Sequence, residues 1–208
     1  QRSMLELSQI ANDIFKERLQ TIAGVSAINI WGEKKYSMKL QLDPVKMAGL
    51  NIFRVMAHGD GLLPAFSRFG GYLLSRTKLD PHLREIAIIR VGILSGASYE
   101  VHQHMRIGRD LGMREALLQA IHEGPGAAAL TEIERQVMAL TDDIVAHVRA
   151  SDATYDPLAA RLSAQEMQEL VVTIGFYMLV SRFLETFDVE IEPEPPSGPA
   201  MDVGQKRA

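Results

Sequence analysis

Residues 80–112, DPHLREIAIIRVGILSGASYEVHQHMRIGRDLG, decide the fold class of this chain. The pair Asp80-Pro81 is typical of a helix N-cap followed by proline at the first helical position. The apolar run after it breaks at Ser95-Gly96, and a second helical pattern over residues 98–110 ends at Gly112. This stretch therefore predicts two consecutive helices joined by a short turn.

Helical signals continue on both sides of that stretch, from residue 51 to residue 187. Pro64 opens an apolar helical segment, Thr131 with Glu134 forms a capping box, and Ser163 with Glu166 forms another. We expect residues 51–187 to form an all-α domain of six or seven helices. Residues 188–208 are acidic and rich in proline, so we expect a disordered tail.

Residues 1–50 follow a different pattern, with a helix over residues 3–19 and two β-type runs over residues 25–31 and 36–42. We expect a small helix–hairpin segment, with its boundary between about residues 46 and 54. Its sequence LQTIAGVSAINIWGEKKYSMKLQLDPVKMAGL resembles part of the porter region of resistance–nodulation–division efflux pumps. One hypothesis is therefore a fragment or fusion related to an efflux transporter. Without membrane spans, it would not be competent for transport.

Composition excludes several classes of function. A net charge of −4 and the lack of a basic cluster argue against a nucleic-acid partner. The chain has no cysteine, which removes thiol chemistry, disulfides and thiolate metal sites. The longest apolar run, over residues 170–180, is shorter than the ~18–20 residues that cross a bilayer. We expect no membrane association and a cytoplasmic protein.

Glu100 and His104 are the candidate proton-transfer pair that the residues themselves indicate. They stand at i, i+4, so their side chains share a helix face and can form a hydrogen bond. Histidine titrates near neutral pH, and a carboxylate beside it can orient the ring. The alternative is a structural ion pair. His102 and His104 lie on different faces of the helix, so we expect no metal site. Arg90, a charge within an apolar helix, is expected to form an intramolecular ion pair, and Tyr177 is expected in the core.

Residues 51–187 resemble the carboxymuconolactone decarboxylase family, whose fold is shared with the alkylhydroperoxidase D proteins. The resemblance rests on NIFRVMAHGDGLLPAF, on GGYLLSRTKL with the helix pair quoted above, and on ELVVTIGFYMLVSRFL. It implies a mainly α, alkylhydroperoxidase D-like helical bundle. Glu85 and His104 match the glutamate and histidine of the peroxidase relay, whereas Ala97 and Glu100 replace its two cysteines. Cysteine-dependent peroxidase activity is therefore excluded.

The resemblance implies acid–base decarboxylation, or related lyase or isomerase chemistry, on a small carboxylated or lactone substrate. His104 would be the acid, positioned by Glu100 and Glu85. Glu100 is expected to be ionised, because it follows a Ser98 N-cap and lies where the helix dipole favours negative charge. Candidate substrate-binding residues are Arg106, Arg109 and Tyr99. We expect a homo-oligomer without metal or organic cofactor. The alternative is a non-enzymatic helical oligomer that binds a ligand or partner.

Overall fold

Helix α6 (Pro81–Ser95) is the central element of the computed structural model, which describes residues 49–193. It packs against α7, α8, α9 and α11, and its residues from Ile86 to Ile89 have no exposed surface. A helix that buries side chains on every side is stable only when it is enclosed by others. The predicted helix–hairpin of residues 1–50 lies, apart from its last two residues, outside the described range.

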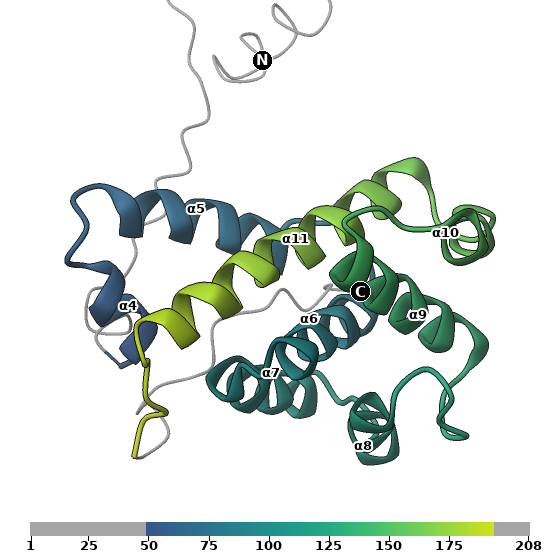
Figure 1. The fold of residues 1–208 in the computed structure, drawn as a ribbon, viewed down its shortest axis with the longest axis horizontal. Coiled ribbons are helices and arrows are strands. Elements are labelled where there is room, and N and C mark those ends of the chain that lie inside the picture. Colours follow the sequence, from purple (N-terminus) through teal and green to yellow (C-terminus); the bar gives the residue numbers. More distant parts are fainter. Residues whose placement is uncertain (1–48, 194–208) are drawn as a thin grey trace, which may run out of the picture. The chain divides into compact units, whose positions relative to one another are not determined.

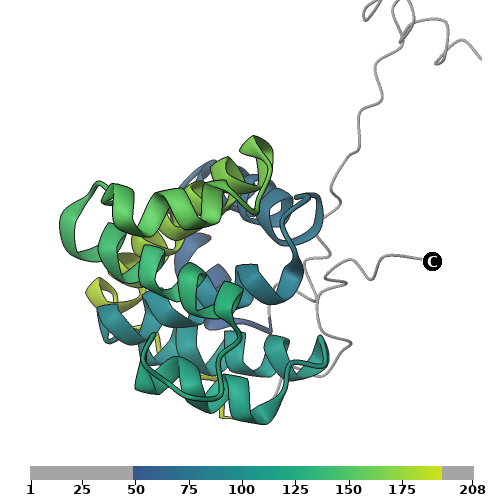
Figure 2. The ribbon, with the colours of Figure 1, turned by 90° about the vertical axis from the view of Figure 1, so that its right-hand side faces the viewer.

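Eight helices make up the described part of the chain, and none of its residues forms a strand (Figure 1). In order they are α4 (Asn51–Met56), α5 (Leu62–Ser75), α6, α7 (Ser98–Asp110), α8 (Glu115–Glu123), α9 (Glu132–His147), α10 (Asp152–Ala159) and α11 (Ala164–Thr186). The view at right angles shows them gathered around one interior (Figure 2). The all-α prediction is confirmed. Short α4, and α10 with a proline inside it, raise the number above the predicted six or seven.

The helix boundaries follow the signals in the sequence closely. The Asp80 carboxylate accepts hydrogen bonds from the backbone N–H groups of His82 and Leu83, at 2.8 and 3.4 Å. Gly96 ends α6 with a φ of 69°, a left-handed conformation that glycine adopts at little cost. One detail was wrong: Ala97 is the N-cap of α7, and Ser98 is its first helical residue.

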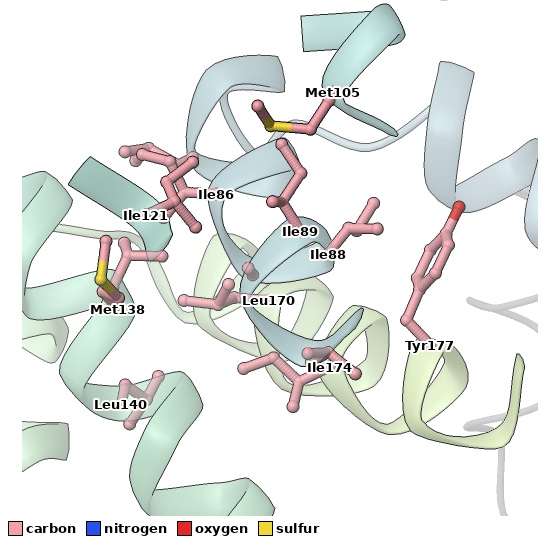
Figure 3. Close-up of a cluster of buried hydrophobic side chains, with 14 of the residues drawn as sticks. Ile86, Ile88, Ile89, Met105, Ile121, Met138, Leu140, Leu170, Ile174 and Tyr177 are labelled. Atoms are coloured by element: carbon pink, nitrogen blue, oxygen red, sulfur yellow. The ribbon is translucent and has the colours of Figure 1, made fainter. Parts of the chain in front are cut away.

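The core lies between α6 and the helices around it (Figure 3). Side chains from five helices meet there: Ile86, Ile88 and Ile89 of α6, Met105 of α7, Ile121 of α8, Met138 and Leu140 of α9, and Leu170, Ile174 and Tyr177 of α11. Burial of this many apolar side chains is the main stabilising contribution to the fold. Tyr177 lies at the edge of the cluster, and its hydroxyl points away from the isoleucines.

Arg90 forms the intramolecular ion pair that the sequence predicts. Its Nε and Nη2 donate to the two Asp142 carboxylate oxygens at 2.6 and 2.8 Å. Its Nη1 donates to the Ile121 carbonyl oxygen at 3.0 Å. This planar, two-bond arrangement ties α6 to α9 and to the end of α8.

Helix α11 is the one described helix that is long and apolar enough to cross a membrane by composition. It is also a core helix, because Leu170 and Ile174 are completely buried against α6 and its neighbours. Core packing accounts for its apolar character.

The segment after α11 runs back beside α4 (Figure 1). The Asn51 side-chain amide donates to the Glu190 carbonyl oxygen at 2.9 Å, and the Asn51 backbone N–H donates to the Glu192 carboxylate at 2.6 Å. Residues 188–193, the first part of the predicted disordered tail, therefore have defined contacts. Residues 194–208 lie outside the described range.

Candidate active site

The centre of the site is a buried hydrogen bond between α6 and α7. His104 Nδ1 lies 2.6 Å from Glu85 Oε2, and the two residues are 7% and 0% exposed. Only Gly96 and Ala97 connect the two helices, so the turn holds them side by side. The structure thus brings together Glu85 and His104, two of the three predicted catalytic residues.

Arg84 completes this buried group. Its Nε donates to Glu85 Oε1 at 3.1 Å, and Arg84 itself is 2% exposed. Isolated charges are costly to bury, and a paired cation offsets much of that cost for a carboxylate. Each Glu85 oxygen therefore has one donor, and the carboxylate is fixed between a guanidinium and an imidazole.

This arrangement determines which His104 nitrogen faces away from Glu85. A carboxylate only accepts hydrogen bonds, so the proton of the short contact belongs to Nδ1. Nε2 is then the nitrogen left to exchange protons, and within residues 49–193 it has no hydrogen-bond partner. Carboxylate–histidine pairs in enzymes position imidazoles in this way.

Glu100 does not contact His104, and the predicted hydrogen bond between them was wrong. Glu100 Oε2 instead accepts from the Ser181 hydroxyl of α11 at 2.9 Å, and Oε1 has no partner among the described residues. The i, i+4 spacing placed Glu100 and His104 on one face. That face meets two different helices, however: the Glu85 carboxylate of α6 accepts from His104, and the Ser181 hydroxyl of α11 donates to Glu100.

The expected ionised state of Glu100 is also not supported. Burial raises the pKa of Glu100 well above its ordinary value of 4.5, nearby Glu185 adds to the rise, and the Ser181 hydrogen bond partly opposes it. The helix dipole stabilises a negative charge by only about 1 kcal/mol at most exposed sites, which is less than desolvation costs a buried carboxylate. Burial therefore favours the neutral form of the Glu100 carboxyl group.

Tyr177 of α11 lies between these two parts of the site. Its ring meets the His104 ring edge to face, with centroids 4.9 Å apart and planes at 88°. Burial raises the pKa of Tyr177 well above 10.0, and the neighbouring Glu85 carboxylate raises it further. Tyr177 is therefore a core residue, as predicted, and also a neutral wall beside the imidazole.

Gly92 allows α6 and α7 to approach closely at this point. A Cβ atom there would lie 3.0 Å from Val101 Cγ2 and 3.4 Å from Glu100 Oε1. A larger residue would push α7 and its carboxyl group away from α6.

The predicted substrate-binding residues lie in separate places. Arg109 pairs with Glu115 in an exposed ion pair, with Nη2 3.0 Å from Oε1. Arg106 is partly exposed on α7 and has no ion pair within residues 49–193. Tyr99 is buried and donates to the Glu192 carboxylate at 2.7 Å. Of these three, only Tyr99 holds a carboxylate group that is partly buried.

Five residues in or beside the site were not predicted for it: Arg84, Tyr177, Ser181, Glu192 and Gln103, whose side-chain amide donates to Glu192 at 2.6 Å. Arg84 had a signal, because it is a second charge in the apolar helix that carries Glu85. Tyr177, Ser181 and Glu192 contact α7 from distant parts of the chain. Gln103 lies next to His104, which the sequence analysis had already selected. In the described part of the chain, no cluster of three His, Asp or Glu side chains is arranged to hold a metal ion.

Comparison with known proteins agrees with this fold. Residues 60–143 match the carboxymuconolactone decarboxylase family. A protein of unknown function from Agrobacterium tumefaciens, suggested to be an AhpD antioxidant-defence protein, superposes with a TM-score of 0.63 at 21% identity, over 67% of this chain and 97% of that one. The debrominase Bmp8, a cysteine-to-alanine variant with bound 2,3,4-tribromopyrrole, gives 0.64 at 20% identity, over 78% and 91%. No curated sequence matches. The family and the alkylhydroperoxidase D-like fold are thus supported, whereas the likeness of residues 1–50 to efflux pumps is not.

Proposed function

We propose that this domain, which carries the carboxymuconolactone decarboxylase family segment at residues 60–143, transfers a proton at a carbon next to a carbonyl group of a small carboxylated substrate. The observation that carries the proposal is the 2.6 Å Glu85–His104 hydrogen bond, which leaves His104 Nε2 to react. General acid–base catalysis needs a group that changes protonation near neutral pH and has a fixed orientation. The hydrogen bond to Glu85 supplies the fixed orientation of the His104 ring.

In the decarboxylation that we propose, the bond between the carboxylate carbon and the neighbouring carbon breaks. Its electron pair moves toward the adjacent carbonyl group to give an enolate, and CO₂ leaves. Protonated His104 then donates the Nε2 proton to the carbon, and the imidazole regains a proton from water. Glu85 is a positioning residue that stabilises the imidazolium. If neutral His104 instead removed a proton from such a carbon and returned it at another position of the enolate, the product would be an isomer of the substrate.

Glu100 takes a different role from the one the sequence indicated. As a buried, protonated carboxyl group it would donate a hydrogen bond to the enolate oxygen as negative charge develops there. A neutral donor suits this task better than a carboxylate, which would repel the developing charge. The site then has one group for the carbon atom and one for the oxygen atom.

The test is proton exchange and CO₂ release with carboxymuconolactone and a panel of small β-keto acids. In D₂O, NMR would follow deuterium at the carbon, and a ¹³C-labelled carboxylate would report CO₂. We expect His104→Ala to lower the rate by about 10²-fold or more, as is typical for loss of a general acid. His102→Ala is the matched control, because His102 is exposed on the same helix. Equal rates for the His104→Ala variant and the unmodified protein would contradict the proposal.

We also propose that the domain self-associates through the outer face of α5 and α11. Phe69 of α5 meets Phe176 of α11 edge to face, with ring centroids 5.2 Å apart, yet 45% of Phe69 is exposed. Tyr72 and Leu179 lie one turn further along these helices and are also exposed. Contiguous apolar surface of this kind is typical of protein interfaces.

A further inference from the structure

The carboxylate of Glu192 lies in a site that the chain builds from three hydrogen-bond donors. The Tyr99 hydroxyl donates to Glu192 Oε1 at 2.7 Å, and the Asn51 backbone N–H donates to the same oxygen at 2.6 Å. The Gln103 side-chain amide donates to Oε2 at 2.6 Å. Together these three donors form the Glu192 site.

The donors suit a single carboxylate. All three are uncharged, and both carboxylate oxygens are engaged. With Glu192 in place, Tyr99 and Gln103 are 3% and 8% exposed, so the carboxylate is held by two buried donors. Hydrogen bonds to an ionised acceptor are roughly twice as strong as those between neutral groups. Burial next to Glu192 also raises the pKa of Tyr99, which keeps its hydroxyl a donor at neutral pH.

The Glu192 site adjoins the proposed proton-transfer residues. Tyr99 and Gln103 each precede one of them, Glu100 and His104, by a single position on α7. Consecutive helical side chains point about 100° apart. The carboxylate-binding face and the proton-transfer face are therefore neighbouring faces of one helix.

From this placement we propose that the Glu192 site is the subsite for the carboxylate group of the substrate, and that Glu192 occupies it as an internal competitor. The inference rests on the proposed function for its link to catalysis. The ligand class is a small monocarboxylate with its carbonyl carbon next to the carboxylate-bearing carbon. A substrate would have to displace residues 190–192 from α4 and α7, so the C-terminal segment would set the apparent affinity.

Binding of benzoate, a planar monocarboxylate, tests this without requiring turnover. Tyrosine labelled with ¹³C in the full chain would be followed by NMR during titration, with the Tyr99 signal assigned through Tyr99→Phe. We expect Glu192→Ala to bind benzoate at least about tenfold more tightly than the unmodified protein, because affinity scales with the fraction of open sites. Glu190→Ala is the matched control. Its side chain is exposed, and only its backbone carbonyl contacts Asn51.

Further variants make each outcome decisive. Adding Gln103→Leu to Glu192→Ala should weaken benzoate binding at least about fivefold while leaving the Tyr99 signal as the readout, and neutral benzamide should not bind. Equal benzoate affinity with and without Glu192, or no binding to either protein, would overturn the inference. Glu192→Gln retains the side-chain size, so it provides the same comparison if the alanine variant does not fold. Adding His104→Ala to Glu192→Ala should leave binding intact, which separates this inference from the proposed chemistry.

Discussion

A Glu85→Gln substitution would leave one accepting oxygen for the two donors around that side chain. Glu85 accepts from Arg84 Nε through one oxygen and from His104 Nδ1 through the other, at 3.1 and 2.6 Å. An amide has one accepting oxygen and one donating NH₂ group. If the oxygen faces Arg84, the NH₂ group faces Nδ1, and the neutral imidazole must carry its proton on Nε2.

The expected loss of activity is large because this is the wrong tautomer for proton transfer. The corresponding change of the histidine-bound aspartate in serine proteases lowers kcat by about 10⁴. We expect Glu85→Gln to lower turnover by about 10²- to 10⁴-fold. It would also lower the free energy of unfolding by about 3–5 kcal/mol, as is usual when one partner of a buried ion pair is lost.

Three measurements on the same samples would check this reasoning. Two-bond ¹H–¹⁵N NMR at a pH where the imidazole is neutral should show Nδ1–H for His104 in the unmodified protein and Nε2–H in the variant. Turnover and urea denaturation followed by circular dichroism give the other two quantities. Glu115→Gln is the matched control, because it changes an exposed carboxylate that also pairs with an arginine, and should alter none of them. The same tautomer in both proteins would refute the positioning role of Glu85.

Four further predictions concern other parts of the molecule. Burial raises the pKa of Glu100, so its contribution to stability is present below pH 4.5 and is lost as pH rises through the folded-state pKa. In urea denaturation from pH 4 to 8, the Glu100→Gln variant should therefore gain stability relative to the unmodified protein as pH rises. Asp142→Ala should lower the free energy of unfolding by about 2–3 kcal/mol, because buried Arg90 would keep only its carbonyl partner. Asp152→Ala, which removes an exposed ion pair, should have little effect on that free energy. The cysteine-free chain should reduce no hydroperoxide with a dithiol above the buffer rate. Light scattering should give a mass above the 23.1 kDa monomer, and Leu179→Glu should reduce it; a monomer at micromolar concentration without that change would contradict self-association.

The sequence predicted well what depends on neighbours along the chain. The cap at Asp80, the helix break at Ser95-Gly96 and the helix over residues 98–110 are all observed. Each is set by backbone requirements within a few residues, which composition and spacing report directly. The placement of a charged Arg90 among apolar residues likewise required a partner, and the structure supplies one.

Side-chain partners across helices were predicted less well. Helical spacing established that Glu100 and His104 share a face of α7, but not that Glu85 and Ser181 would compete for them from α6 and α11. The Glu85 position came from the family resemblance rather than from periodicity. Tyr99 was predicted to bind substrate, and its observed partner, Glu192, lies in a segment for which the sequence predicted no order.

The contacts around His104 span very different lengths of chain, and this sets the order in which the site assembles during folding. Glu85 and His104 are 19 residues apart, on two helices joined by a tight turn, whereas the contact between Glu100 and Ser181 spans 81 residues. Local contacts close short loops at small entropic cost, whereas contacts between distant residues form only after more of the chain has folded. The imidazole and its carboxylate would therefore meet in a nascent helical hairpin. The carboxyl group at Glu100 would stay in water, and so ionised at neutral pH, until α11 docks and excludes solvent.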